Sequence, residues 1–177
     1  CNCDGAVVLL LAGHVYALDQ MKEDAKAKDR CNVIVLSVLM SLDLLDAYAK
    51  YRIFPYFFTN HTYFWGDAHL ANVGEVRGSF ISPLRSAIDR GIRAANHTDY
   101  NVTPVNQMFV VWSAVNRITR SGSVIGPEER ITPYEALQAI TINGAYMYFE
   151  EDSKGSLEPG KVADLVILDR NPLKVDP

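Results

Sequence analysis

Short β-branched or aromatic runs alternate along this chain with longer stretches whose apolar residues recur at helical spacing. The run Asn-Val-Ile-Val-Leu at residues 32–36 is apolar on both sides, which is typical of a strand in a sheet that is covered on both faces. Residues 53–58 form a second such run, in which Pro55 is unusual because proline cannot donate a hydrogen bond to a neighbouring strand. The expected strands cover residues 32–36, 53–58, 79–81, 92–95 and 162–168.

Helical patterns fill most of the chain between these runs. Leu42, Leu45 and Tyr48 are spaced to share one apolar face of a helix that Ser41 caps. Residues 132–135, Thr-Pro-Tyr-Glu, have the pattern of a capping box with proline in the first turn. The expected helices cover residues 6–20, 41–50, 82–91, 107–120 and 133–143, with a charged, solvated stretch at 21–30 and a long aromatic loop at 59–78.

Strands that alternate with helices predict βα units and a parallel sheet, the α/β class. About four such units precede the last expected strand. A closed (β/α)₈ barrel usually takes about 250 residues and at least about 200, whereas this chain has 177. The sequence therefore predicts either a part of a barrel or a smaller open α/β domain.

Composition and charge narrow the classes of partner. The chain is 49% hydrophobic and carries 17 Lys and Arg against 21 Asp and Glu, a net charge of -4. This ordinary globular balance argues against a nucleic-acid partner or an anionic membrane, since both favour a basic face. The longest apolar stretch, residues 6–12, is far shorter than the roughly 18 residues of a membrane span. Three cysteines form no closed disulfide framework, so we expect a reducing, cytoplasmic setting.

Two polar side chains follow expected strands, where parallel α/β sheets place their active groups. His61 comes after residues 53–58, and Asp99 comes after residues 92–95. An imidazole and a carboxylate at such strand ends can share a divalent metal such as zinc, and the carboxylate can also take a proton from bound water. The alternative is structural: His61 is then a hydrogen-bonded loop histidine, and Asp99 caps the turn before the next helix.

Other candidates are weaker. His69 is expected in a polar loop facing solvent, and His14 within an apolar helix, where packing explains it. Cys1 could act as an N-terminal nucleophile, but the pattern does not predict the antiparallel sandwich expected for that chemistry. The aromatic residues between Phe54 and Trp65 are explained by a core strand and a pocket wall rather than by base stacking, because no basic residues are interleaved among them.

Several segments resemble known families. Residues 155–169, Gly-Ser-Leu-Glu-Pro-Gly-Lys-Val-Ala-Asp-Leu-Val-Ile-Leu-Asp, resemble the closing segment of the metal-dependent amidohydrolase superfamily, which returns from a barrel to a small β-sandwich. Residues 57–67 and 97–104, together with 114–122 and 126–130, resemble the amidohydrolase-3 branch, which includes deformylases of N-substituted formamides. The resemblance covers nearly the whole chain.

The resemblance implies one or two metal ions, usually zinc, at the mouth of a (β/α)₈ barrel, and hydrolysis of C–N bonds in small amides, cyclic amides or formamides. By position, His61 matches a histidine ligand at the end of the sixth strand. Asp99 matches the aspartate after the eighth strand, which binds metal and moves the proton of the hydrolytic water. His97, Asn101 and Trp65 would lie beside the substrate or behind the ligands.

The chain also departs from the family pattern. Residues 33–37 resemble the family's fifth strand, but Leu36 stands where a histidine ligand is expected, and leucine cannot bind zinc. The opening resembles a His-x-x-Gly-Asp-x-Ala segment, but it begins after the histidine and has Cys3 in place of the glycine. The His-x-His pair of the first strand is absent.

These departures imply the C-terminal half of a barrel enzyme, with residues 1–150 as a partial (β/α)₈ barrel and residues 151–177 as the return segment to the β-sandwich. At most two ligands remain, so the chain alone should bind metal poorly. We expect its open sheet edge to be covered by a missing N-terminal half or by a second copy, as a homo-oligomer. The alternative is a non-catalytic or truncated relative that acts as an interaction module or is inert.

Overall fold

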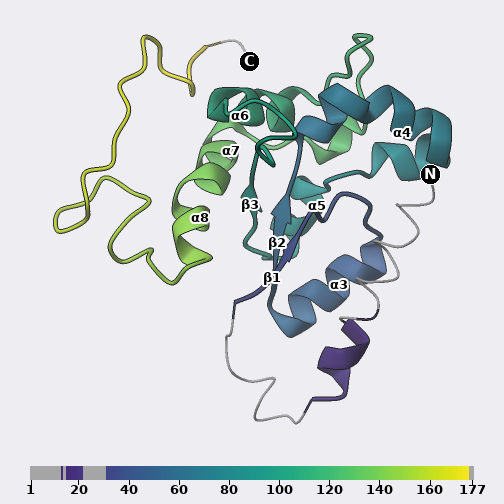
Figure 1. Ribbon diagram of the computed structural model, residues 1–177, viewed down its shortest axis with the longest axis horizontal. Helices are drawn as coiled ribbons and strands as arrows, with labels where there is room; N and C mark the ends of the chain where they lie inside the picture. Colours follow the sequence, from purple (N-terminus) through teal and green to yellow (C-terminus); the bar gives the residue numbers. More distant parts are fainter. Residues whose placement is uncertain (1–12, 14, 22–30, 176–177) are drawn as a thin grey trace.

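The structure is a computed structural model, and it describes residues 13, 15–21 and 31–175. Its centre is a sheet of three parallel strands, β1 (Asn32–Val35), β2 (Ile53–Phe57) and β3 (Ala95–Asn96). The strands lie in the order β1-β2-β3, with Val35 beside Tyr56 and Phe57 beside Asn96. Consecutive described strands are therefore neighbours that run in the same direction (Figure 1). This confirms the α/β class with a parallel sheet, and the partial barrel stays a prediction.

Short helices pack around this sheet. They are α3 (Leu42–Tyr51), α5 (Leu84–Asp89), α6 (Gln107–Asn116), the 3₁₀ turn η1 (Pro127–Glu129), α7 (Pro133–Ile140) and α8 (Ile142–Tyr146). The face of α3 that packs into the core consists of Leu44, Leu45 and Tyr48. Leu42, which was predicted to share this face, is 53% exposed, because it begins the helix and Leu44 takes the buried position.

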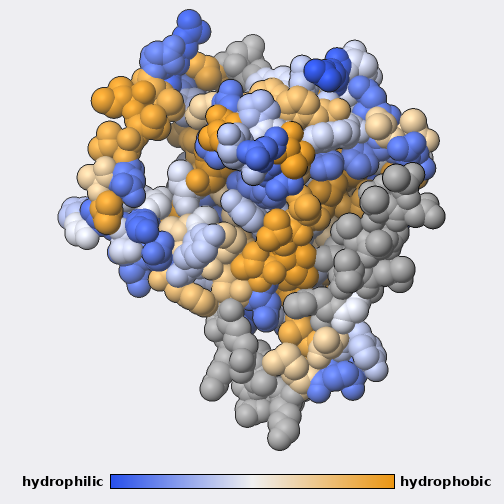
Figure 2. All heavy atoms as spheres, viewed as in Figure 1, coloured by the Kyte–Doolittle hydropathy of each residue, from blue (hydrophilic) through white to orange (hydrophobic). Residues whose placement is uncertain are grey.

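The two faces of β2 contribute to two separate clusters. Phe57 packs with the helices in the larger core cluster, which includes Leu45 and Tyr48. Phe58, one position on, points to the other face and packs with a smaller cluster that includes Ile81 and Ile125. Figure 2 shows apolar side chains gathered over the sheet in the middle of the face in view.

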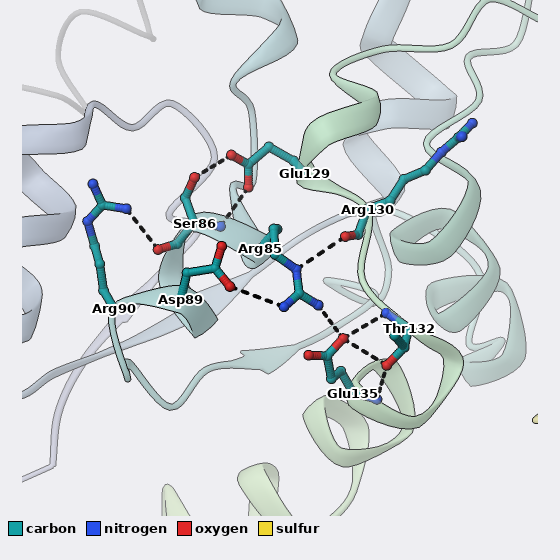
Figure 3. Close-up of polar contacts among 8 residues, drawn as sticks. All are labelled: Arg85, Ser86, Asp89, Arg90, Glu129, Arg130, Thr132 and Glu135. Atoms are coloured by element: carbon teal, nitrogen blue, oxygen red, sulfur yellow. Dashed lines mark hydrogen bonds and ion pairs between the residues drawn. The ribbon is translucent and has the colours of Figure 1, made fainter.

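The predicted capping box at the start of α7 is confirmed. The Glu135 N–H donates to Thr132 Oγ1 over 3.3 Å, and the Thr132 N–H donates to the Glu135 carboxylate over 2.8 Å. The same carboxylate forms an ion pair with Arg85 of α5. Glu129 of η1 accepts the Ser86 N–H over 2.9 Å. These contacts hold α5 against η1 and the beginning of α7 (Figure 3).

Two helices end earlier than predicted. The helix expected over residues 133–143 is interrupted at Thr141 (φ -126°, ψ -95°), whose hydroxyl donates to the Leu137 carbonyl over 2.7 Å. A threonine side chain that bonds a carbonyl of the preceding turn competes with helix geometry. The helix expected to reach residue 120 ends at Asn116, because Arg117 adopts a left-handed conformation with a φ of 52°.

The prediction of a loop for the aromatic segment at residues 59–78 is wrong. The segment forms the helix α4 (Asn60–Ser79). Tyr63 packs against Phe109 of α6, with ring centroids 5.1 Å apart, whereas Trp65 packs against Phe58 at 6.2 Å. Aromatic side chains thus lie on more than one side of α4, so the sequence shows no single apolar stripe from which a helix could be predicted.

The strand predicted at residues 79–81 is absent as well. The helix before it is kinked at Gly74, which has a φ of 80°, and continues to Ser79. Ile81 then makes only an isolated antiparallel bridge with Leu39. Within the described part of the chain, no strand separates β2 from β3.

The last predicted strand, residues 162–168, is not formed. Its residues are in irregular conformation, and Ile167 is 90% exposed. A strand needs a partner that satisfies its backbone groups, and the arm that carries these residues runs away from the described sheet (Figure 1). The boundary between residues 150 and 151 stays a prediction.

The predictions for the beginning of the chain lie mostly outside the described residues. Residues 15–19 are helical, in agreement with part of the helix expected over 6–20. The structure leaves undescribed His14, the first cysteines and all but Met21 of the charged stretch predicted at 21–30. None of the helices in the described ranges has the length and apolar character that crossing a membrane requires.

Candidate functional site

The ends of β2 and β3 place the predicted chemical groups at one edge of the sheet. Phe57 pairs with Asn96 in parallel register, so both strands reach their carboxyl ends together. Thr59, Asn60 and His61 follow β2 directly, with His61 in the first turn of α4. Asp99 follows β3 by three residues, in a turn. His61 and Asp99 therefore emerge from neighbouring strands at the same edge, where α/β proteins bind ligands.

Direct pairing of β2 with β3 changes the strand count on which the resemblance rests. That resemblance places His61 after a sixth strand and Asp99 after an eighth. The strand predicted from the sequence pattern at residues 79–81 would lie between them. Since no strand lies between β2 and β3 in the described sheet, β2 is the seventh strand if β3 is the eighth. Leu36, after β1, then stands at the end of the sixth strand rather than the fifth. The match of His61 with a sixth-strand ligand is not supported by the sheet.

A buried asparagine joins the ends of the two strands. The Asn96 Oδ1 atom accepts the Thr59 N–H over 3.1 Å and the His97 N–H over 3.2 Å. Its Nδ2 group donates to Thr59 Oγ1 over 2.7 Å. Thr59 is fully buried and Asn96 is 3% exposed, so water replaces none of these bonds readily. Asn96 therefore fixes the start of α4, and with it His61, relative to the turn that carries Asp99.

We expect Asn96→Ala to lower the free energy of unfolding by about 1–3 kcal/mol, because the buried Thr59 N–H loses its partner. The His97 N–H keeps the Phe57 carbonyl, and the Thr59 hydroxyl keeps the Val110 carbonyl. Urea unfolding followed by circular dichroism measures the change. Asn72→Ala, at an exposed position of α4, is the control and should change stability by less than about 0.5 kcal/mol. Equal unfolding midpoints for the two variants would contradict this role of Asn96.

His97 lies between two aromatic rings on the face of the sheet that carries Phe58. Its ring centroid is 4.2 Å from that of Tyr56 and 5.2 Å from that of Phe58. The backbone N–H of Asp99 donates to His97 Nδ1 over 3.1 Å, so in the neutral ring the proton lies on Nε2. That Nε2 group is buried and has no partner among the described residues. Burial lowers the pKa of His97, and the nearby Asp99 carboxylate opposes this shift.

His61 is enclosed by aromatic side chains. Its ring meets Phe58 edge-on at 4.7 Å and lies 4.6 Å from the ring of Trp65. Its Nδ1 atom is 3.0 Å from Nε2 of His69, one of two hydrogen-bonded imidazoles on α4. The prediction that His69 faces solvent is therefore wrong, because α4 turns it toward His61. Burial, together with the neighbouring His69 and His97, lowers the pKa of His61 to about 4.

This shift predicts an acid-sensitive fold. The ordinary histidine pKa of 6.5 falls to about 4 in the folded state. Between these values the unfolded chain binds a proton that the folded chain does not, so stability is present above pH 6.5 and is lost as the pH falls toward 4. A difference of about 2.5 pKa units corresponds to about 3 kcal/mol. Urea unfolding at about pH 7 and about pH 4.5 should show most of this loss, and His61→Gln should largely abolish the difference between the two pH values. The same pH dependence in both proteins would contradict the assignment.

The remaining candidates lie near this edge with different exposure. Asp99 is half-buried in a turn with a φ of 49°, and its carboxylate forms no hydrogen bond or ion pair with the described residues. Asn101 is exposed and Trp65 is half-buried against His61. Asn60, fully buried, donates to Thr103 Oγ1 over 3.1 Å and so ties α4 to the end of the same turn.

The side chains present do not fit a complete metal centre. No three His, Cys, Asp or Glu side chains within residues 13, 15–21 and 31–175 lie close enough together to hold a metal ion. Leu36 offers no ligand atom, and its side chain packs against the cluster that contains Phe58 and Trp65. A catalytic zinc ion takes three protein ligands. A centre at this edge would therefore need at least one ligand from outside the described residues.

Comparison with known proteins decides the family. The model of the Amidohydrolase family matches residues 9–177, nearly the entire chain. The chain belongs to the amidohydrolase family. This confirms the family inferred from the motifs around His61, His97 and the segment at 155–169.

Relatives of this amidohydrolase include proteins named for different reactions. It is 34% identical over 110 residues to N-substituted formamide deformylase from Arthrobacter pascens, which covers 62% of this chain and 20% of that protein. It is 35% identical over 91 residues to imidazolonepropionase from Treponema denticola, covering 50% of this chain and 19% of that protein. The chain thus matches about a fifth of the length of these relatives.

A solved structure supports the fold. The crystal structure of an uncharacterized metal-dependent hydrolase from Pyrococcus furiosus has a TM-score of 0.71 and 26% sequence identity. The match covers 89% of this chain and 31% of that structure. The arrangement of β1, β2 and β3 with their helices is therefore one that a metal-dependent hydrolase also contains.

Sequence reasoning missed what two residues do. Asn96 precedes His97 in the sequence, and nothing in its neighbours indicates that it binds Thr59. His69 had a signal that could have been used, since residues 61, 65 and 69 are spaced four apart and would share one helical face. That spacing is informative only once the segment is known to be a helix.

Proposed function

We propose that this amidohydrolase takes part in the hydrolysis of a non-peptide C–N bond, in a small amide, cyclic amide or formamide, with water as the nucleophile. The observation that carries this proposal is the parallel pairing of β2 with β3, which brings His61 and Asp99 to one edge of the sheet. Family membership supports the reaction class, and relatives named as a formamide deformylase and an imidazolonepropionase support small C–N substrates.

In the proposed reaction Asp99 handles the proton. Its carboxylate takes a proton from water as the water oxygen bonds to the carbonyl carbon, and then gives that proton to the nitrogen as the C–N bond breaks. The absence of an ion pair with the described residues leaves the Asp99 carboxylate available for this transfer. The prediction that Asp99 and His61 bind a divalent ion such as zinc stays a prediction, because the described side chains do not complete such a site.

The neighbouring side chains are proposed to shape the pocket. His61, with its pKa lowered to about 4, is uncharged at neutral pH and offers a nitrogen to the site. Phe58 and Trp65 provide an apolar wall beside it, which suits an apolar substituent on the substrate nitrogen. His97 and Asn101 are proposed to lie beside the substrate or behind the reacting groups, by position.

We also propose a setting for the protein. A small-molecule substrate agrees with the family. The three cysteines, which form no closed disulfide framework, favour a cytoplasmic location. Neither β1 nor β3 has a second neighbour among the described strands. We propose that a further stretch of the protein or a second copy of this chain pairs with these edges.

One observation favours a non-catalytic relative as the second candidate. Leu36 follows β1, donates its N–H to the Tyr56 carbonyl over 3.1 Å and packs its side chain in an apolar cluster, at a position where the family has a ligand. If this residue limits metal binding, Leu36→His should raise the affinity for Zn²⁺ by at least about tenfold, measured by calorimetry on the full chain. Leu36→Gln, polar but without an imidazole, is the control. Equal affinities for the two variants would contradict a ligand position at residue 36.

Hydrolysis by the purified full chain tests the proposed function. An N-substituted formamide, a linear amide and a cyclic amide are each incubated with the protein and added Zn²⁺, and the released amine or opened ring is measured. We expect turnover of at least one class only with Zn²⁺ in large excess over the protein, because the chain should bind metal poorly. A chelator should abolish this turnover, and renewed excess Zn²⁺ should restore it. No hydrolysis of any of the three classes would contradict the proposal and favour the non-catalytic relative.

A further inference from the structure

Three aromatic side chains form a row along α4, next to the edge of the sheet. His61, Trp65 and His69 are spaced four residues apart, so they follow one another on the helix surface. The ring of His61 lies 4.6 Å from that of Trp65 and 5.3 Å from that of His69. His61 Nδ1 and His69 Nε2 are 3.0 Å apart, a hydrogen bond between two imidazoles.

Such a bond constrains both rings. Two lone pairs, or two N–H groups, would repel each other at this distance, so one proton lies between the nitrogens. A neutral imidazole has one N–H and one lone pair. If His61 Nδ1 holds the shared proton, its Nε2 presents a lone pair. If His69 Nε2 holds it, His61 Nε2 instead bears a hydrogen.

We infer that His69 is a positioning residue, which accepts the Nδ1–H of His61 and thereby holds His61 with a lone pair on Nε2. The inference rests on the proposed function, because a group that accepts a proton or binds a cation at the sheet edge needs that lone pair. A histidine that works through one nitrogen commonly donates its other N–H to a fixed acceptor. His69 is the acceptor that the structure provides for His61 Nδ1.

The neighbouring His97 is held in the opposite tautomer. The Asp99 N–H donates to His97 Nδ1, which leaves the hydrogen of a neutral ring on Nε2. With His69 accepting from His61, the edge of the sheet carries one imidazole whose Nε2 accepts and one whose Nε2 donates. Hydrolysis of a C–N bond involves both accepting and donating protons, so a site with both kinds of nitrogen suits it.

The protonation pattern can be measured without any substrate. We propose long-range ¹H–¹⁵N correlation spectra of the full chain with labelled histidine at neutral pH, with the His61 signals assigned from His61→Gln. The unmodified chain should show the proton of His61 on Nδ1. His69→Phe keeps a ring beside Trp65 but cannot accept a hydrogen bond, so in this variant the His61 proton should move to Nε2. His69→Gln, whose amide oxygen accepts, should restore it, and Glu75→Gln, at an exposed position of α4, should have no effect.

A His61 proton on Nε2 in the unmodified chain would overturn the inference, and so would a tautomer that stays the same in His69→Phe or is not restored in His69→Gln. If His69→Phe does not fold, the unmodified chain and His69→Gln still decide it. Where hydrolysis is measurable, His69→Phe should lower kcat by about 10–100-fold with little change in KM. A chain that shows the expected tautomer but hydrolyses nothing would contradict the proposed function and leave the positioning role of His69 intact.

Discussion

Replacing Asp99 by asparagine is expected to lower kcat/KM for the cleaved amide or formamide by about 10²- to 10⁴-fold, the usual contribution of a positioned acid–base group. Asparagine has nearly the same shape but cannot take a proton from water. The Asp99 N–H that binds His97 Nδ1 belongs to the backbone and is kept in this variant. The loss should therefore appear mainly in kcat, with the fold unchanged.

The matched control is Asp152→Asn, which removes a carboxylate at an exposed position away from the sheet edge. It should keep the turnover of the unmodified chain. Circular dichroism and the urea midpoint of Asp99→Asn should match those of the control. Turnover in Asp99→Asn within about threefold of the control would show that Asp99 does not carry the proton.

Replacing Arg117 by methionine is expected to have the largest effect on stability. The Arg117 side chain is fully buried. Its guanidinium donates to the Ile125 carbonyl over 2.8 Å, the Ile81 carbonyl over 2.8 Å, the Ser79 carbonyl over 3.2 Å and the Ser82 carbonyl over 3.3 Å. One side chain thus ties the end of α6 to the segment after α4 and to the loop before η1.

Burial lowers the pKa of Arg117 to about 10, while Glu129 and Glu128 oppose the shift, so the group stays charged at neutral pH. Methionine fills much of the same volume but leaves the carbonyl oxygens of Ser79, Ile81 and Ile125 without this donor. The Ser82 carbonyl keeps the Leu84 N–H over 2.9 Å. At about 1–3 kcal/mol for each buried group that loses its partner, we expect a loss of about 3 kcal/mol or more.

Urea unfolding at neutral pH measures this loss, and Arg170→Met on the exposed arm is the control, with an expected change of less than about 0.5 kcal/mol. Arg117→Lys keeps the charge but has three donors instead of five. Its loss in free energy of unfolding should therefore lie between those of Arg117→Met and the control. Should Arg117→Met prove too unstable to purify, the lysine variant still gives a value. A change below about 1 kcal/mol in both Arg117 variants would contradict the role of this network.

Local signals in the sequence predicted the features that depend on few neighbours. The capping box at Thr132 and Glu135 follows from two side chains and the backbone between them, and it is present. The parallel strands β1 and β2 follow from short apolar runs, and Pro55 is tolerated in β2. The family was also within reach, since its motifs are continuous segments of the chain.

Features that depend on distant contacts were not predictable from local pattern. The segment from Asn60 to Ser79 is helical because its aromatic side chains pack on several partners, which hides the usual stripe. The third predicted strand and the last one had suitable residues, but Ile81 makes only a single bridge and Ile167 has no strand beside it. The hydrogen bond between Asn96 and Thr59 joins residues 37 positions apart, and no local sequence pattern around either residue predicts it.

Strand count is the most consequential of these errors. Absence of a strand at residues 79–81 makes the strands before His61 and Asp99 immediate neighbours. The candidate groups therefore share one edge more directly than the resemblance implied, while His61 loses its match with a sixth-strand ligand. A role of His61 in the site is now supported by its hydrogen bond to His69 and by its contact with the ring of Trp65.

A double-mutant cycle with His61→Gln and Asp99→Asn tests most directly whether these two side chains act on one reacting centre. The measured quantity is kcat/KM of the unmodified chain, each single variant and the double variant on the same substrate. Groups that act as a unit give strongly non-additive losses. We predict that the double variant is within about threefold of the more damaged single variant. Losses that multiply across the cycle would show that His61 and Asp99 act independently and would contradict a shared site at the edge of the sheet.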